Sequence, residues 1–260
     1  MAFVKVKCTN CGSNLMVDNI NDAAICRFCS SPFIIEKAMN NYNNNNMKVK
    51  VVNTYDKNEN NFQIISGILK KYNGASNKIV IPNTASKIGH MAFLNCESLK
   101  SVIIPETVTE IGYKAFYHCN NLTDITISNS VTKIYAEAFG DCSNLTSITI
   151  PNSVTEIGSR AFGGCSNLIN VTLSNSVAEI KSWSFGDCCN LKNIIIPDSV
   201  KKIASDAFYN CSSLTSITLP NSSMEIGWRA FSSCSSLTSI IIPNKISLKL
   251  DAMHLKPPCT

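Results

Sequence analysis

A 23-residue period runs through most of this 260-residue chain and constrains its fold more than any other feature. Phenylalanine and cysteine return at that interval in a fixed relation, with each phenylalanine three positions before a cysteine. The recurring residues are Phe93, Phe116, Phe139, Phe162, Phe185, Phe208 and Phe231, and Cys96, Cys119, Cys142, Cys165, Cys188, Cys211 and Cys234. Because so short a unit cannot bury its apolar side alone, successive units must stack along one axis.

The physical meaning of one unit can be read from LTSITIPNSVTEIGSRAFGGCSN, residues 145–167. Ile148 and Ile150 alternate with Thr149, a pattern that predicts a short strand with one buried face. Pro151 ends that strand because it has no N–H group for a ladder hydrogen bond. The VTEIG segment then predicts a second extended stretch, and SRAFGGC predicts a tight helical turn that presents its Ala, Phe and Cys inward.

The predicted fold class is therefore a repeat solenoid, mainly β, whose 23-residue coils contribute parallel strands and short helical turns. Neighbouring strands should lie about 4.8 Å apart, a spacing that would also allow disulfides between equivalent cysteines. Seven cysteines cannot all pair, however, and alternate coils would need different conformations, so we interpret them as buried, reduced thiols. Eight equivalent strands are expected, beginning near Ile79, Val102, Ile125, Ile148, Val171, Ile194, Ile217 and Ile240.

The recurring pattern LxxIxIPxxVxxIGxxAFxxCxx resembles the BspA-like, or Treponema-type, leucine-rich repeats over about residues 79–244. Departures from the pattern are local. Serine replaces the Pro at Ser128 and Ser174, other residues replace the Gly at Tyr135, Lys181 and Ala204, and Ser184 replaces the Ala. The resemblance implies a leucine-rich repeat solenoid, and similar proteins are often found on cell surfaces, which makes an adhesin one alternative.

The four cysteines nearest the N-terminus obey a different rule. Cys8, Cys11, Cys26 and Cys29 form a C-x2-C-x14-C-x2-C pattern, close to the spacing of four-cysteine zinc sites. The segment resembles a rubredoxin-like zinc ribbon, in which SNLMVDNINDAAICRFC is a strand, a turn and a strand, and SPFIIEKA is a third strand or the start of a helix. We expect one structural Zn²⁺ per chain, because four thiolates leave no open coordination position. Iron or two disulfides are the alternatives.

Composition divides the chain into five parts. An Asn-rich stretch with little to bury is the natural linker between the ribbon and the repeats. A hairpin that turns near Ser66 and Gly67 is expected to cover the first coil, since exposed sheet edges need protection. The expected parts are a zinc ribbon (1–38), an Asn-rich linker (39–48), an N-terminal cap of the solenoid (49–78), the leucine-rich repeats (79–244) and a C-terminal partial coil or tail (245–260).

The charge and the N-terminus bear on location and partners. The formal net charge is +5, and no run of Lys or Arg is longer than two. The charge therefore gives little indication of binding to nucleic acid or to anionic membranes. Lys5 and Lys7 interrupt the first apolar residues, so no signal peptide is expected. Apolar runs also stay far below the roughly 18 residues of a membrane span. We expect a cytoplasmic protein without membrane insertion, the alternative being the cell surface by a non-classical route.

The outward side of the predicted first strands is the main candidate binding surface. Its residues alternate with the buried isoleucines, and most carry hydroxyl or amide groups, although strand propensity alone also favours Thr there. The candidate partner-binding residues are Asp124, Thr126, Ser147, Thr149, Asn170, Thr172, Asn193, Ile195 and Thr218. A second candidate surface, or a shield between neighbouring coils, contains Tyr113, Lys114, Arg160, Trp183, Trp228 and Arg229.

These observations favour a non-catalytic scaffold that binds one or more protein partners through the solenoid and carries a structural zinc module. No carboxylate pair, P-loop or nucleotide fingerprint appears at a meaningful spacing, so we do not expect an enzyme. The alternatives are a nucleic-acid-associated protein that acts through the ribbon, with Lys5, Lys7 and Arg27 near phosphate, and a BspA-like surface adhesin.

Overall fold

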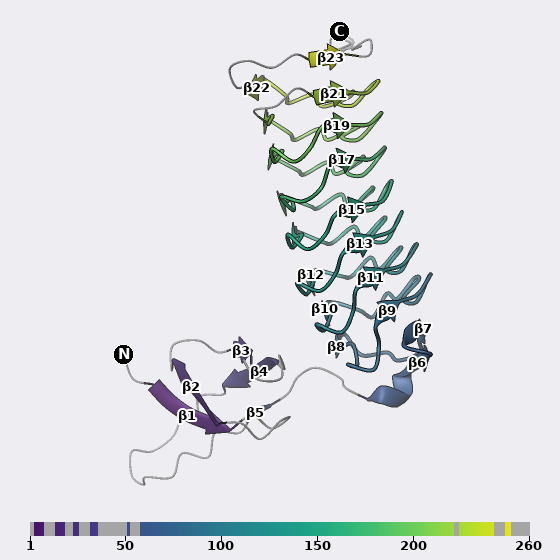
Figure 1. Ribbon diagram of the computed structural model, residues 1–260, viewed down its shortest axis with the longest axis vertical. Helices are drawn as coiled ribbons and strands as arrows, with labels where there is room; N and C mark the ends of the chain where they lie inside the picture. Colours follow the sequence, from purple (N-terminus) through teal and green to yellow (C-terminus); the bar gives the residue numbers. More distant parts are fainter. Residues whose placement is uncertain are drawn as a thin grey trace. The chain divides into compact units, whose positions relative to one another are not determined.

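The computed structural model divides into two compact units, Met1–Asp56 and Lys57–Thr260, which are described separately (Figure 1). In the residues that it describes, helix is limited to the short 3₁₀ segment η1 (Glu59–Asn61), and no helix is long and apolar enough to cross a membrane. The residues described are 3–7, 14–18, 23–25, 32–35, 51–52, 58–220, 224–241 and 248–250.

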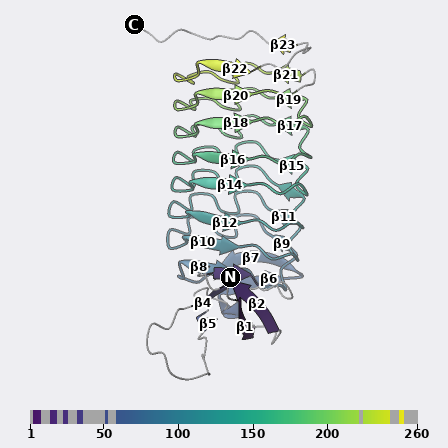
Figure 2. The same cartoon turned by 90° about the vertical axis from the view of Figure 1, so that its left-hand side faces the viewer.

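The first strands of successive coils lie side by side in the larger unit (Figure 2), and they pair in parallel within two hydrogen-bonded sheets. The central residue of each strand faces the core, as Ile148 does between the exposed Ser147 and Thr149, and it is buried in every strand except the two whose central residues, Val171 and Ile240, are partly buried. The eight strands start at the positions expected from the repeat. They are β8 (Lys78–Val80), β10 (Ser101–Ile103), β12 (Asp124–Thr126), β14 (Ser147–Thr149), β16 (Asn170–Thr172), β18 (Asn193–Ile195), β20 (Ser216–Thr218) and β22 (Ser239–Ile241).

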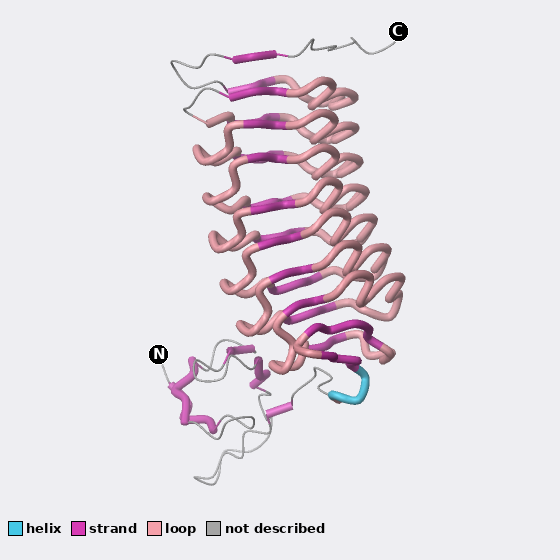
Figure 3. The backbone as a smooth tube through the Cα atoms, turned by 45° about the vertical axis from the view of Figure 1, so that its right-hand side comes forward, coloured by secondary structure: helices cyan, strands magenta, loops and turns pink. Residues whose placement is uncertain are grey.

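A second stack of short parallel strands follows the turn after each first strand (Figure 3). In Glu156–Ile157, for example, the Ile side chain is buried and the Glu side chain lies on the outer surface. These strands are β9 (Lys87–Ile88), β11 (Glu110–Ile111), β13 (Lys133–Ile134), β15 (Glu156–Ile157), β17 (Glu179–Ile180), β19 (Lys202–Ile203), β21 (Met224–Ile226) and β23 (Leu248–Leu250).

The first coil is extended by an antiparallel hairpin of β6 (Phe62–Ile65) and β7 (Ile68–Tyr72). Its turn is formed by Ser66 and Gly67, which both have positive φ, the conformation that a two-residue hairpin turn of type I′ needs. β7 pairs in parallel with β9, so the hairpin continues the second stack and occupies its N-terminal edge.

A ladder of phenylalanine rings forms the centre of the core. Rings in neighbouring coils are stacked with their planes 4–8° apart and their centroids 4.7–5.5 Å apart, from Phe93 to Phe231. Tyr72 of the hairpin joins the ladder at its N-terminal end, 5.3 Å from the ring of Phe93. The coil spacing is therefore set by ring stacking as well as by strand pairing.

The segment around each phenylalanine is a chain of turns, so the prediction of a short helical turn was wrong. The residues two positions before and two positions after the phenylalanine have positive φ in every described coil, as do Arg160 and Gly164 around Phe162. A right-handed helical turn cannot include such residues.

The physical reason is that half of the backbone N–H groups on this side bond to the next coil. Arg160 and Phe162 donate to the carbonyls of Ser182 and Ser184 at 3.0 Å, whereas Gly163 and Cys165 close local turns. A helix would satisfy these N–H groups inside one segment. Here, N–H groups that bond to the next coil alternate with N–H groups that close local turns, so each coil is hydrogen-bonded to the next along the whole turn-rich side.

The repeated cysteines have free, mostly buried thiols, as the sequence predicted. From Cys119 onward, each of these thiols donates to the carbonyl of the phenylalanine in the preceding coil, as Cys165 does to Phe139 at 3.2 Å. The same contact recurs with Sγ–O distances of 3.0–3.2 Å from Cys119 to Cys234. Burial raises the pKa of the Cys165 thiol to about 12 and also raises the pKa of the Cys142 and Cys188 thiols.

The smaller unit contains two antiparallel groups of strands. β1 (Phe3–Lys7) pairs with β2 (Asn14–Asp18), and β4 (Pro32–Ile35) pairs with β3 (Ala23–Ile25) on one side and β5 (Val51–Val52) on the other. Part of the SPFIIEKA segment is thus a strand. Since β5 belongs to this sheet, the unit includes residues that the sequence had placed in the solenoid cap.

Replacing Phe162 by Ala should lower the free energy of unfolding by about 3–5 kcal/mol, because it removes a buried ring and leaves a cavity between two stacked neighbours. Urea denaturation followed by circular dichroism measures the effect. Ile195→Ala is the matched control, since that side chain is 70% exposed and should lose little stability. A loss below about 1 kcal/mol for Phe162→Ala would contradict a ring-stacked core.

Alkaline pH should destabilise the protein through its buried thiols. An unfolded thiol ionises near pH 8.5, whereas Cys165 in the folded chain keeps its proton until about pH 12, so stability is lost as pH rises from about 8.5. Between pH 7.5 and pH 10 this thiol alone should account for about 2 kcal/mol. Urea denaturation of Cys165→Ala should show that much less pH dependence than the parent chain, and equal slopes would contradict the buried-thiol account.

Candidate functional site

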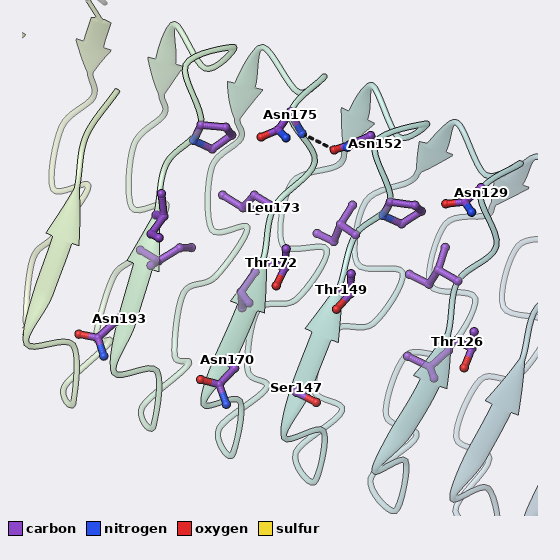
Figure 4. A pocket seen from close by; sticks show the side chains of 18 of the residues that line it. Thr126, Asn129, Ser147, Thr149, Asn152, Asn170, Thr172, Leu173, Asn175 and Asn193 are labelled. Carbon is purple, nitrogen blue, oxygen red and sulfur yellow. Dashed lines mark hydrogen bonds between the residues drawn. The ribbon is translucent and has the colours of Figure 1, made fainter. Parts of the chain in front are cut away.

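The outer face of the first strands contains a groove of about 910 Å³ that crosses several coils (Figure 4). Residues of β12, β14, β16 and β18 line it, together with the turns that follow these strands. Alternation along each strand explains its composition, because Ile148 points into the core and Ser147 and Thr149 point outward. The groove is therefore lined by these outward residues and, between them, by apolar residues at the edge of the core, namely Ile125, Ile127, Ile150, Val171, Leu173 and Ile194.

The groove contains eight of the nine partner-binding residues proposed from the sequence. They are Asp124, Thr126, Ser147, Thr149, Asn170, Thr172, Asn193 and Ile195. Thr218, in β20, lies on the same face but is not part of the lining, and it is half-buried. The structure thus brings these side chains into one concave surface, which the repeat alone did not locate.

Asparagines in the turns after the strands form one rim of the groove, and sequence reasoning missed them. Asn129, Asn152 and Asn175 occupy the same position in three consecutive coils, and the backbone N–H of Asn175 donates to Oδ1 of Asn152 at 2.9 Å (Figure 4). Their 23-residue spacing was visible in the sequence. Asparagine after a strand is typical of a turn, so this spacing alone does not indicate a binding surface.

The groove lies where the stack of first strands is interrupted. The hydrogen-bonded strands of the described chain form one sheet of β8, β10 and β12 and a separate sheet of β14, β16, β18, β20 and β22. β16 and β18 share only the Asn170–Asn193 register, which indicates a second loose step. Fewer backbone hydrogen bonds therefore join these coils on this face, where amide and hydroxyl side chains line the groove.

The groove is almost uncharged. Of the nineteen described residues that line it, Asp124 is the one with a formal charge, and its Oδ2 accepts a hydrogen bond from Ser101 Oγ at 3.1 Å. Ser101, which occupies the position of Asp124 in the preceding coil, is only 5% exposed, so an outward position in a first strand is not always open to solvent. The short serine side chain turns to the neighbouring carboxylate because that acceptor lies within its reach.

Apolar side chains mark the C-terminal part of this face. Ile195 is 70% exposed and lines the groove, and Ile241 in β22 is 52% exposed. Exposed isoleucines on a sheet that otherwise carries Thr, Ser and Asn offer contact area that water solvates poorly. The face therefore combines neutral hydrogen-bonding groups with local apolar contact points.

The residues of the second candidate surface contact other side chains of the turn-rich side. The Arg229 guanidinium lies 4.7 Å from the Trp228 ring centre and 4.8 Å from that of Tyr209, and its Nε is 3.2 Å from Asp206. Arg160 pairs in the same way with Asp141 at 3.4 Å.

Further along the same side, the Lys114 ammonium lies 4.8 Å from the Tyr117 ring centre and 3.4 Å from the Glu137 carboxylate. The Trp183 ring lies 5.0 Å from Tyr209. Most of these contacts join neighbouring coils. The set therefore packs the coils against one another and does not consist of side chains free to bind a partner.

The four cysteines proposed as zinc ligands, Cys8, Cys11, Cys26 and Cys29, lie outside the described residues. The described strands nevertheless locate them along the chain. The first pair falls in the connection between β1 and β2, and the second falls between β3 and β4, so that each pair is bracketed by an antiparallel pair of strands.

Comparison with known proteins identifies the repeat. The family model for the BspA type leucine rich repeat region, in 6 copies, matches residues 70–192 and 132–252. The leucine rich repeat protein of T. pallidum is 33% identical, with a TM-score of 0.63, and the match covers 65% of this chain and 82% of that one. No curated protein sequence matches the chain.

A leucine-rich repeat protein from Eubacterium ventriosum ATCC 27560 is also similar in structure. It is 25% identical, with a TM-score of 0.56, and the match covers 67% of this chain. This chain spans only 57% of the length of that protein, so the likeness concerns the solenoid.

Proposed function

Because the chain belongs to the BspA-type leucine-rich repeat family, we propose that its solenoid is a non-catalytic scaffold that binds a protein partner in the groove of the first-strand face. The observation that carries the proposal is the location of the groove, which collects the hydroxyl, amide and apolar side chains of four coils on one surface. An extended concave surface of this kind is the usual binding site of solenoid proteins.

The chemistry of the groove indicates the kind of partner. Its polar lining is almost entirely neutral, so a bound segment should match it with amides, hydroxyls and apolar side chains rather than with charges. The exposed Ile195 supplies an apolar contact within the groove. Binding should therefore depend weakly on salt, in contrast to nucleic-acid binding, which falls steeply as salt rises.

The buried thiols support the non-catalytic part of the proposal. A nucleophilic cysteine requires a lowered pKa and an adjacent base. Burial instead raises the pKa of Cys119, and its Sγ donates to the Phe93 carbonyl at 3.0 Å even though His118 precedes it in sequence.

Placing Arg at Thr149 should abolish partner binding, because a long cation would fill the middle of the neutral groove. Affinity capture from the native host, with bound proteins identified by mass spectrometry, should lose a specific protein with Thr149→Arg at both low and high salt. Ser159→Arg is the matched control, since Ser159 is exposed on the turn-rich side away from the groove. If both variants retain the same proteins as the parent chain, the groove is not the binding site.

We further propose that the smaller unit is a structural zinc ribbon with Cys8, Cys11, Cys26 and Cys29 as ligands. The support is the position of each cysteine pair between antiparallel strands, which is the arrangement of a zinc knuckle. Four thiolates would complete a tetrahedral site, and the metal would stabilise a unit too small to have a large core.

Metal analysis of the purified protein should find about one zinc per chain, lost in Cys8→Ser and retained in the control Cys189→Ser, whose thiol is half-buried in the solenoid. All 13 thiols should react after unfolding with a chelator. An absence of metal with nine reactive thiols, 13 minus four, would instead show two disulfides. Iron in place of zinc would give a coloured protein.

A further inference from the structure

The two loose steps of the first-strand face lack a hydrogen bond that the other steps share. The residue after a first strand normally donates its N–H group to the last residue of the next first strand, as Ile150 does to Thr172 at 2.9 Å. Among the described residues, Ile127 and Leu173 do not form this bond, at the steps from β12 to β14 and from β16 to β18. The residues that donate it, at 2.9–3.1 Å, are Ile81, Ile104, Ile150, Ile196 and Leu219.

The two loose steps follow the two coils in which serine replaces the proline of the repeat. Ser128 comes directly after Ile127, and Ser174 comes directly after Leu173. The coils that form the bond have proline at this position, namely Pro82, Pro105, Pro151, Pro197 and Pro220. The exchange of proline for serine therefore coincides, both times, with the loss of the bond to the next coil.

Both serine hydroxyls bond in the opposite direction, to the preceding coil. Ser128 Oγ donates to the Pro105 carbonyl at 3.0 Å, and Ser174 Oγ donates to the Val154 carbonyl at 2.6 Å. The two serines are only 6% and 0% exposed. Proline has no hydroxyl and no N–H group, so it cannot make such a bond. Serine thus adds a hydrogen bond on one side of its turn where the bond on the other side is missing.

A side-chain hydrogen bond is lost at the same two steps. At the regular step from β14 to β16, Ser176 Oγ donates to the Asn152 carbonyl of the preceding coil at 2.7 Å. Ser153 and Ser199 hold the equivalent positions on the far side of the loose steps, and their hydroxyl oxygens are buried without a hydrogen-bond partner in the described chain. Each loose step therefore leaves a buried hydroxyl unsatisfied, which is rare in folded proteins.

The loosening is confined to the first-strand face. On the turn-rich side of the same two steps, Phe139 donates to the Ala161 carbonyl at 2.8 Å and Phe185 donates to the Ala207 carbonyl at 2.9 Å. The second-stack strands also stay paired there, β13 with β15 and β17 with β19. The coils are thus held together elsewhere, and the lost bonds concern the face that contains the groove.

The apolar lining of the groove lies at the loose steps. Pro151 and Pro197, just beyond them, are half-buried, whereas Pro82, Pro105 and Pro220 are buried. Before the loose steps, Ile125 is 8% exposed and Val171 is partly buried, whereas the equivalent Val102 and Ile217 are fully buried. The residues that gain exposure all line the groove, namely Ile125, Pro151, Val171 and Pro197.

We propose that the hydroxyl groups of Ser128 and Ser174 cause the two loose steps and thereby place the groove between β12 and β18. The serines are then positioning residues of the partner-binding site. This role in binding rests on the proposed function, whereas the loosening rests on the hydrogen-bond pattern of the free chain. A solenoid with proline in every coil would pair its first strands at each step and bury the same apolar residues.

Amide hydrogen exchange of the full-length chain without a partner, resolved by residue with NMR, tests the loosening. The Ile127 and Leu173 amides should be about tenfold less protected than that of Ile150, because they lack its hydrogen bond. Ser128→Pro should raise the protection of Ile127 about tenfold and leave that of Leu173 unchanged, which makes Leu173 an internal control. Equal protection of Ile127 and Ile150 in the parent chain, or no gain in the variant, overturns the proposal.

The converse substitution tests the hydroxyl itself. Pro105→Ser should loosen the regular step from β10 to β12 and lower the protection of Ile104 about tenfold. Pro105→Ala is the matched control, because it removes the ring without supplying a hydroxyl, and it should leave Ile104 protected. An equal loss of protection in both variants would assign the loosening to the missing ring and contradict the role of serine.

Affinity capture from the native host tests the positioning role. The double variant Ser128→Pro, Ser174→Pro should capture about tenfold less of the protein that Thr149→Arg loses, because closing the steps reburies the apolar lining. If the double variant gains protection at both steps but captures that protein as well as the parent chain does, the serines do not position the site. If Thr149→Arg also retains the protein, the proposed function fails together with the positioning role, and the exchange result still decides what loosens the steps.

Discussion

Backbone hydrogen bonds from coil to coil on the turn-rich side are the interactions on which the rest of the solenoid depends. Each described coil holds residues with positive φ on both sides of its phenylalanine, a conformation that costs about 1–2 kcal/mol for most residues. Alternate N–H groups in this segment reach carbonyls of the next coil. The strain is therefore offset only when a neighbour is present, and the strands, ring ladder and thiol contacts all require that neighbour.

The repeat predicted the parts of the fold that depend on side-chain identity at fixed positions. Strand starts, buried Ile and Phe columns and reduced cysteines follow from the 23-residue spacing, because stacking makes sequence equivalence into spatial equivalence. The turn geometry around Phe162 could not be read in the same way, since it depends on carbonyls supplied by another coil. The sequence predicted the outward residues but not that they line a groove, because the groove lies at an interruption in strand pairing that no single residue indicates.

The solenoid presents faces of opposite chemical character although each coil has only 23 residues. The first-strand face is neutral and rich in Thr and Asn, whereas the second-stack face carries ion pairs such as Lys133 with Glu156. Both are made from residues that alternate with buried isoleucines, so substitutions on either face leave the core intact. This arrangement lets surface chemistry vary from coil to coil while the fold is preserved.

The accessibility of the repeated cysteines reports local unfolding of the solenoid. Cys165 and Cys188 are fully buried, whereas Cys96 and Cys234, near the two ends of the ladder, are half-buried. A coil at either end can separate from the stack while the inner coils stay together, because each coil contacts only its neighbours. The order in which a thiol-specific label reaches successive cysteines would then trace fraying inward from the ends, one coil at a time, without any engineered cysteine.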